Sequence, residues 1–289
     1  GTAEQKERFL PALVAGHALA GFGLTEPGAG SDAGATRTRA ELTADGGEWV
    51  VNGAKQFITN SGSEITSVVT VTARTGVRED GRPEISAIML PSDTPGFTAE
   101  PAYDKLGWHA SDTHPLTFVD AHVPADHLLG ERGRGYAQFL ATLDDGRVAI
   151  SALATGCIQA CLDMALTYAG ERESFGAPIG RKQGVAFQIA DLQVMLDASR
   201  LLTYRAAALK DAGASAQAFK QAAAVAKLYT TESAVSATRI ATQVFGGYGF
   251  MEEYPVARFY RDAKVLEIGE GTSEVQRMLI ARGLGLPVE

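Results

Sequence analysis

A single carboxylate, Glu270, lies between two glycines in the segment Gly269-Glu270-Gly271-Thr272-Ser273-Glu274. Part of this segment fits an ordinary helix start, with Thr272 or Ser273 as the N-cap and Glu274 in an acidic first turn. That interpretation leaves Glu270 unexplained, because flanking glycines make its backbone mobile and open to a ligand. A carboxylate in a dry pocket has a raised pKa and can act as a general base. Glu270 is therefore a candidate functional residue.

A second segment rich in small residues reads Thr25-Glu26-Pro27-Gly28-Ala29-Gly30-Ser31-Asp32. Small residues let a backbone approach a ligand closely, and exposed amides in such a loop can bind a pyrophosphate or a polarised ring atom. The segment lacks the Gly-Lys-Ser/Thr of a phosphate-binding loop and does not open a βαβ unit. Taken alone, it fits a tight surface turn equally well.

Two further segments complete the set. Phe57-Ile58-Thr59-Asn60-Ser61-Gly62 follows a predicted strand, where an aromatic ring beside a threonine could pack on and hydrogen-bond a planar cofactor. Alone, it is more typical of ordinary strand packing. The fourth segment runs from Gln243 through Phe245-Gly246-Gly247-Tyr248-Gly249 to Arg261-Asp262-Ala263-Lys264.

The elements that must position these residues change character along the chain. From about 20 to 130 the pattern favours strands, because β-branched runs alternate with turn sequences such as Asp45-Gly46-Gly47 and Asn52-Gly53. The predicted strands are 48–51, 55–59, 67–72, 85–90 and 116–119. Helical periodicity predicts a short helix within 3–16 and longer ones within 140–162, 185–196, 222–244 and 273–281. The sequence predicts an α+β fold, with an antiparallel β-barrel or sandwich followed by an antiparallel helical bundle.

Composition narrows the functional classes. The chain has 289 residues and a net charge of −8, which argues against a nucleic-acid or anionic-membrane partner. No run of about 18 apolar residues is present, so no membrane-spanning segment is expected. Cys157 and Cys161 are too few for a metal site and are expected to be small buried residues in a reduced protein.

Together, and in their order along the chain, the four segments resemble the acyl-CoA dehydrogenase family, most closely its short-chain and short-branched-chain members. The resemblance covers essentially the whole chain. It implies three regions: 1–19 as the end of an N-terminal helical domain that is otherwise missing, 20–130 as the β domain, and 131–289 as the C-terminal helical bundle. The family's cofactor is FAD, and no metal is implied.

The resemblance also assigns roles to individual residues. Glu270 occupies the position of the catalytic base. The residues that match FAD contacts are Phe22, Leu24, Thr25, Gly30, Ser31, Phe57, Ile58, Thr59, Arg172, Ser174, Phe175, Gln183, Gln243, Gly246, Gly247, Thr272 and Glu274. The residues that match acyl-CoA contacts are Ser31, Asp144, Arg147 and Gly271.

The implied reaction begins when Glu270 removes the α-proton of an acyl-CoA thioester. The Glu270 backbone amide and a flavin ribityl hydroxyl would polarise the thioester carbonyl. The β-hydrogen would pass as hydride to flavin N5, giving a trans-2-enoyl-CoA, and the electrons would pass to an electron-transferring flavoprotein. FAD contacts across a subunit boundary imply a homo-oligomer, usually a tetramer. The expected location is the cytoplasm, or the mitochondrial matrix in a eukaryote.

Two positions bear on the base and on the substrate. Family members commonly have Tyr before the base, whereas this chain has Gly269, which predicts a wider acyl pocket. Some branched-chain members place their base on the preceding helix, at a position that matches Gly146, which cannot act as a base. Two alternatives remain open: an acyl-CoA oxidase that uses oxygen, or a non-catalytic subunit of a heteromeric assembly.

Overall fold

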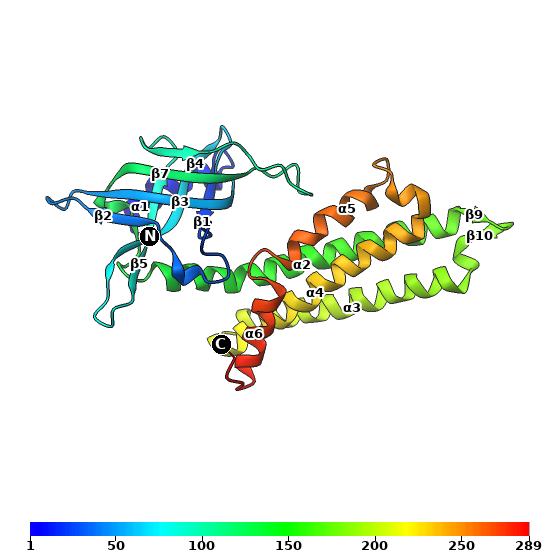
Figure 1. The fold of residues 1–289 in the computed structure, drawn as a ribbon. Helices are drawn as coiled ribbons and strands as arrows, with labels where there is room; N and C mark the ends of the chain where they lie inside the picture. The colour runs from blue at the N-terminus through cyan, green and yellow to red at the C-terminus, as the bar shows by residue number, and fades with distance from the viewer. Residues whose placement is uncertain (289) are drawn as a thin grey trace. The chain divides into compact units, whose positions relative to one another are not determined.

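The computed structural model describes residues 1–288, which form two compact units (Figure 1). The first unit comprises Gly1–Lys105 and His109–Ala141, and the second comprises Leu106–Trp108 and the chain from Thr142 onward. The change of unit therefore falls within a helix at 141/142, and residues 1–19 belong to the same unit as the sheet.

The first unit opens with helix α1 (Ala3–Val14), within the predicted range 3–16. Thr2 and Gln5 form a capping box, because the side-chain oxygen of each accepts from the backbone amide of the other. The buried Gln5 side chain also donates to the carbonyls of Asp126 (2.6 Å) and Leu128 (2.9 Å), which ties α1 to the strand side of the unit.

The body of the first unit is one eight-stranded sheet. Its strands run in the order β6-β7-β3-β2-β4-β5-β8, and β1 also pairs with β4. The strands are β1 (Leu19–Gly23), β2 (Arg39–Leu42), β3 (Glu48–Thr59), β4 (Thr66–Val77), β5 (Pro83–Pro91), β6 (Phe97–Ala99), β7 (Thr113–Pro124) and β8 (Leu128–Leu129). Most pairings are antiparallel, as expected, but β1–β4 and β2–β4 are parallel, so the sheet is mixed.

One predicted turn is wrong and one is confirmed. Asp45-Gly46-Gly47 turns between β2 and β3, where the Asp45 carboxylate accepts from the Gly47 amide at 3.1 Å. Asn52-Gly53 lies inside β3, so the predicted strands 48–51 and 55–59 are a single strand with a register shift between Val51 and Gly53. Glycine is needed at this position because a Cβ at Gly53 would lie 2.6 Å from Thr38 Oγ1.

The second unit is helical. Its elements are most of α2 (Gly135–Glu171), the short hairpin β9 (Glu173–Ser174) and β10 (Ala177–Pro178), α3 (Gln183–Asp211), α4 (Ala216–Phe245), α5 (Pro255–Ala263), the 3₁₀ turn η5 (Lys264–Glu267) and α6 (Ser273–Gly283). The predicted helices are present, and α5 is an addition. Alanines and leucines from α2, α3 and α4 share one buried core, which includes Ile158, Leu192 and Ala237.

Helix α2 is long and apolar enough to cross a membrane by length and composition, with a mean hydropathy of 1.5 over its most apolar stretch. The expectation that no segment could qualify is therefore too strong by this criterion. Core helices pass the same test, and α2 contributes Ala154, Ile158, Cys161 and Leu162 to the bundle core. Cys161 is buried and Cys157 half-buried, and both are free thiols.

Candidate active site

Glu270 lies in the short loop that joins η5 to α6. Its backbone φ is +56° and that of Gly271 is +86°, so two successive residues adopt the left-handed conformation. Non-glycine residues adopt this conformation rarely, and it is concentrated at functional sites. Thr272 then begins α6, because its hydroxyl accepts from the Val275 amide at 3.3 Å. Of the two predicted N-cap candidates, Thr272 and Ser273, the structure has Thr272.

The Glu270 side chain points at helix α2. A Cβ built on Gly146 would lie 2.6 Å from Glu270 Oε2, so a side chain at this position would require the carboxylate to move. The two positions that sequence comparison treats as alternatives for a base are thus neighbours in space. Of the two, only Glu270 has a side chain that can accept a proton.

Charged neighbours oppose the effect of burial on the pKa of Glu270. Burial raises the pKa of Glu270 above its usual range, while Arg147 and Lys227 lower it. Arg147 is only 4% exposed and forms an ion pair with Asp144 one turn earlier. The structure therefore brings the predicted substrate residues Asp144, Arg147 and Gly271 together with Glu270 in the second unit. The result is a half-buried carboxylate whose raised pKa suits it to accept a proton.

Gly269 leaves open space beside this carboxylate. A Cβ built there would meet one atom at van der Waals distance, the Val265 carbonyl oxygen at 3.5 Å. No side chain among residues 1–288, apart from the two chain neighbours, lies within 4 Å of that Cβ.

A separate pocket of about 500 Å³ lies at the other end of the second unit's bundle. Its lining includes four residues predicted to contact FAD: Arg172, Ser174, Gly246 and Gly247. Gly246 has a φ of +59°, and nothing lies within 4 Å of a Cβ built on either glycine, so side chains there would fill the pocket. The guanidinium of Arg172 lies 5.7 Å from the Tyr248 ring centroid. An arginine beside open backbone suits a phosphate group.

The remaining predicted FAD residues of this unit do not line the pocket. Phe175 is 94% exposed with a φ of +55°, and Gln183 and Gln243 are exposed at the starts and ends of helices α3 and α4. Glu274 is exposed in the first turn of α6.

In the first unit, a buried ion pair anchors the glycine-rich segment 25–32 to strand β3. Lys55 Nζ lies 2.7 Å from Glu26 Oε1, and both side chains are at most 4% exposed. Burial would raise the pKa of Glu26, but Lys55, the Thr36 hydroxyl and the Arg37 amide lower it to about 2. Among the predicted FAD residues near this pair, Leu24 is buried, and the Thr25 carbonyl accepts a hydrogen bond from the Gln56 amide at 2.9 Å. Phe22 stacks on Phe139, with ring centroids 4.1 Å apart. Gly30 and Ser31 lie exposed in the loop.

The segment from Phe57 to Thr59 ends β3 in an unusual conformation. Phe57 has a φ of +61° and is 59% exposed, whereas Ile58 is 2% exposed. An exposed aromatic ring on a strained backbone is not explained by strand packing, and it suits a face for a planar ligand.

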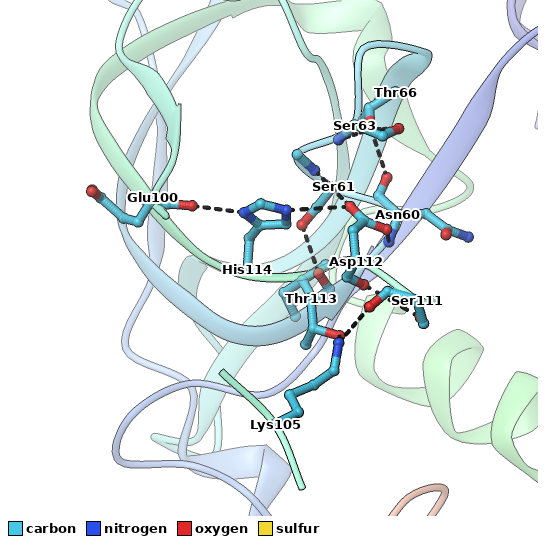
Figure 2. A network of polar contacts seen from close by, with 12 residues as sticks. Asn60, Ser61, Ser63, Thr66, Glu100, Lys105, Ser111, Asp112, Thr113 and His114 are labelled. Atoms are coloured by element: carbon cyan, nitrogen blue, oxygen red, sulfur yellow. Dashed lines mark hydrogen bonds and ion pairs between the residues drawn. The ribbon is translucent and has the colours of Figure 1, made fainter. Parts of the chain in front are cut away.

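Asp112 fixes the turn that follows (Figure 2). Its carboxylate accepts from the amides of Asn60 (3.0 Å) and Gly62 (3.2 Å), and His114 Nε2 lies 3.4 Å from it. A Cβ on Gly62 would lie 2.5 Å from the His114 ring, so glycine is needed here. Figure 2 shows these side chains converging on the end of β3.

Sequence reasoning missed five residues that hold the site. Glu26 lies inside the glycine-rich segment. Lys55 falls on the same alternation of β3 as the buried Trp49 and Val51, and this alternation indicates a buried side chain. Asp112 and Lys227 give no local signal, because their partners are distant in sequence. The fifth residue, Gln276, bonds carbonyls only five and six residues earlier in the chain.

Comparison with known proteins fits this geometry. Residues 21–121 match the acyl-CoA dehydrogenase middle domain, and residues 133–285 match the acyl-CoA dehydrogenase C-terminal domain. The chain therefore belongs to the acyl-CoA dehydrogenase family, whose members are FAD-dependent oxidoreductases.

Among its relatives, a probable acyl-CoA dehydrogenase, YngJ, of Bacillus subtilis is 49% identical over 98% of this chain and 73% of its own length. The bovine mitochondrial short-chain specific acyl-CoA dehydrogenase is 44% identical, over 97% of this chain and 66% of its own length. The chain thus spans about two thirds to three quarters of these relatives.

Solved structures of acyl-CoA dehydrogenases have the same fold as this chain. Butyryl-CoA dehydrogenase from Megasphaera elsdenii superimposes with a TM-score of 0.92 and is 44% identical, over 98% of this chain and 72% of that one. An acyl-CoA dehydrogenase complexed with FAD from Bacillus anthracis gives a TM-score of 0.89 at 32% identity, over 99% of this chain and 52% of that one.

Proposed function

We propose that this chain is the base-bearing and FAD-binding part of an acyl-CoA dehydrogenase that forms the trans-2-enoyl thioester from a short or short-branched acyl-CoA. The observation that carries the proposal is the position of Glu270. Its carboxylate occupies the space that a side chain at position 146 would take, and burial raises its pKa. A thioester α-hydrogen is a very weak acid, so its removal needs a base of this kind.

Glu270 takes the α-proton on its carboxylate. Its main-chain amide polarises the thioester carbonyl and so stabilises the negative charge that develops on the oxygen. Arg147 and Lys227 keep enough of the carboxylate ionised, because both lower the pKa that burial raises. When bound, FAD supplies the acceptor for the β-hydrogen.

Residues of both units suit FAD. In the second unit, Arg172 and Ser174 would hold phosphate oxygens, and the open backbone of Gly246 and Gly247 would admit the adenosine end. In the first unit, the exposed ring of Phe57 with Thr59 would contact the flavin ring, while Thr25 would lie near its pyrimidine side. The remaining predicted contacts stay part of this proposal, with Ser31 on the acyl-CoA.

The test is flavin reduction without oxygen. Glu270→Gln keeps the size of the side chain but cannot accept a proton, so the variant should retain FAD and fail to bleach with any acyl-CoA. The matched control is Glu253→Gln, which changes an exposed glutamate in the loop before α5. This variant should bleach normally. Near wild-type bleaching by the Glu270 variant would overturn the proposal.

The open space at Gly269 supports a short or short-branched acyl group, with a methyl branch next to the thioester accommodated there. A panel of thioesters from butyryl to palmitoyl, including isobutyryl and isovaleryl, tests this preference. A maximum at palmitoyl would contradict it.

For the electrons, we propose an electron-transferring flavoprotein as acceptor. An aerobic assay without that protein separates this from an oxidase, since an oxidase would turn over and form peroxide. We also propose a homotetramer, in the cytoplasm or, in a eukaryote, in the mitochondrial matrix. Purified protein that shows no FAD absorbance would instead favour the non-catalytic subunit.

A further inference from the structure

Lys227 is a charged side chain in the middle of an alanine-rich helix core. It lies on α4 among Ala223, Ala224 and Ala226, and its exposed fraction is 0%. Within residues 1–288 no carboxylate lies within 4 Å of its ammonium, which donates instead to the Gly271 carbonyl at 2.8 Å. Buried lysines are costly unless paired, so one retained with a single carbonyl acceptor calls for a functional explanation.

The acceptor of Lys227 belongs to the loop that carries the base. Gln276 on α6, also 0% exposed, donates from Nε2 to the carbonyls of Gly271 (2.8 Å) and Glu270 (3.3 Å). Two buried side chains from different helices therefore hold the same carbonyl. They hold it where Glu270 and Gly271 both have positive φ, a conformation that persists only when the surroundings impose it.

Lys227 also contributes charge to the base. Burial lowers the pKa of Lys227 to about 8; Glu270, Glu267 and Glu232 raise it and Arg147 lowers it. These are the charged groups that face it from η5, α4, α2 and the loop. Below about pH 8 its ammonium stays charged and favours the ionised form of Glu270.

We propose that Lys227 is a positioning residue for the dehydrogenation: through the Gly271 carbonyl it holds Glu270 in the left-handed conformation that aims its carboxylate at Gly146, and its ammonium offsets the burial of that carboxylate. This inference rests on the proposed role of Glu270. Lys227 does not touch substrate. It acts on the reaction by fixing the geometry and the proton affinity of the base.

The test compares three variants in the FAD-loaded protein. Lys227→Met removes both the charge and the donor, Lys227→Arg keeps both, and Lys220→Met removes a lysine seven residues earlier on the same helix as the matched control. With Lys227→Met, kcat should fall about 10- to 100-fold with little change in KM, because small misplacements of a catalytic group have effects of this size. The acid limb of the kcat profile should move up by about one pH unit, since Glu270 loses a nearby positive charge.

A second readout does not depend on turnover. Amide hydrogen exchange of the peptide that covers 269–272 should speed up in Lys227→Met and stay slow in Lys227→Arg and Lys220→Met. If Lys227→Met does not fold, Lys227→Gln, which keeps a donor without the charge, tests the pH shift instead.

The outcomes distinguish a failure of the positioning role of Lys227 from a failure of the proposed function. An unchanged acid limb and unchanged exchange in the Lys227 variants, with Glu270→Gln inactive, would overturn this inference and leave the proposed function standing. An active Glu270→Gln variant would overturn the proposed function first. Recovery of the wild-type pH profile by arginine but not by methionine is the expected result.

Discussion

At the scale of single residues, the relation between Gly146 and Glu270 is the most restrictive feature of the site. A helix interior does not favour glycine, yet α2 has one where a methyl group would lie 2.6 Å from the Glu270 carboxylate. The glycine leaves the Glu270 carboxylate in its observed position.

Gly146→Ala should separate activity from stability. The methyl group must displace the Glu270 carboxylate, so the rate of flavin reduction should fall at least about tenfold, while alanine should leave helix stability unchanged or raise it by up to about 1 kcal/mol. Gly156→Ala on the same helix has nothing within 4 Å of the new Cβ and is the control. Stopped-flow reduction and thermal unfolding of both variants decide the point; equal reduction rates in the two would contradict it.

Gly269 makes a prediction about selectivity. Gly269→Tyr would fill the space beside the base, so kcat/KM for isobutyryl-CoA should drop about 10-fold or more relative to butyryl-CoA, the discrimination usual for one methyl group in a pocket. The measurement is the ratio of the two kcat/KM values. A ratio that does not change would mean that the open space at 269 does not receive the acyl group.

At the scale of elements, the ion pair of Glu26 and Lys55 connects the glycine-rich segment to β3. Breaking a buried pair by neutralising one partner leaves an unpaired charge in the core. Glu26→Gln should therefore lower the free energy of unfolding by about 3–5 kcal/mol. Glu41→Gln, on an exposed position of β2, should have little effect. Urea unfolding of the two variants tests this, and equal midpoints would contradict it.

The same pair predicts an acid-sensitive stability. The pKa of Glu26 is lowered from 4.5 to about 2 in the folded protein, so the unfolded chain takes up the proton first as the pH falls. Its contribution is complete above about pH 4.5 and is lost as the pH falls toward 2. Urea midpoints measured from pH 6 to pH 3 should fall more steeply for the wild type than for Glu26→Gln. Parallel curves would count against the assignment.

The sequence predicted elements better than their connections. Helices α3, α4 and α6 follow from apolar periodicity and caps, and the motif residues around Glu270 follow from the family resemblance. The Asn52-Gly53 pair has the local chemistry of a turn, but Thr38 packs so closely on Gly53 that the strand continues. Lys227 and Asp112 could not be predicted, because each acts on a backbone group distant in the sequence.

At the scale of the whole molecule, helix α3 presents apolar side chains to solvent. Phe187, Val194 and Leu201 repeat at seven-residue spacing along α3, and Tyr204 follows three residues later; all four are 62–70% exposed. An apolar stripe of this kind is expected at a subunit contact. It supports the proposed homotetramer.

Leu201→Glu should weaken that contact, because a carboxylate would be buried without a partner. Sedimentation velocity should show smaller species than the wild type, and loss of FAD should accompany it if the cofactor contacts cross subunits. Gln193→Glu, which adds the same charge at an exposed polar position of α3, is the control. A Leu201 variant with the wild-type sedimentation coefficient would contradict the assignment of this face.

The most direct test of the account is proton removal itself. Butyryl-CoA is incubated with the protein in D₂O without an electron acceptor, and deuterium at the α-carbon is followed by mass spectrometry. The wild type should introduce deuterium at that carbon, and Glu270→Gln should reduce the rate by about 10²-fold or more, the contribution expected of a general base. Exchange by Glu270→Gln at the wild-type rate would show that another group is the base.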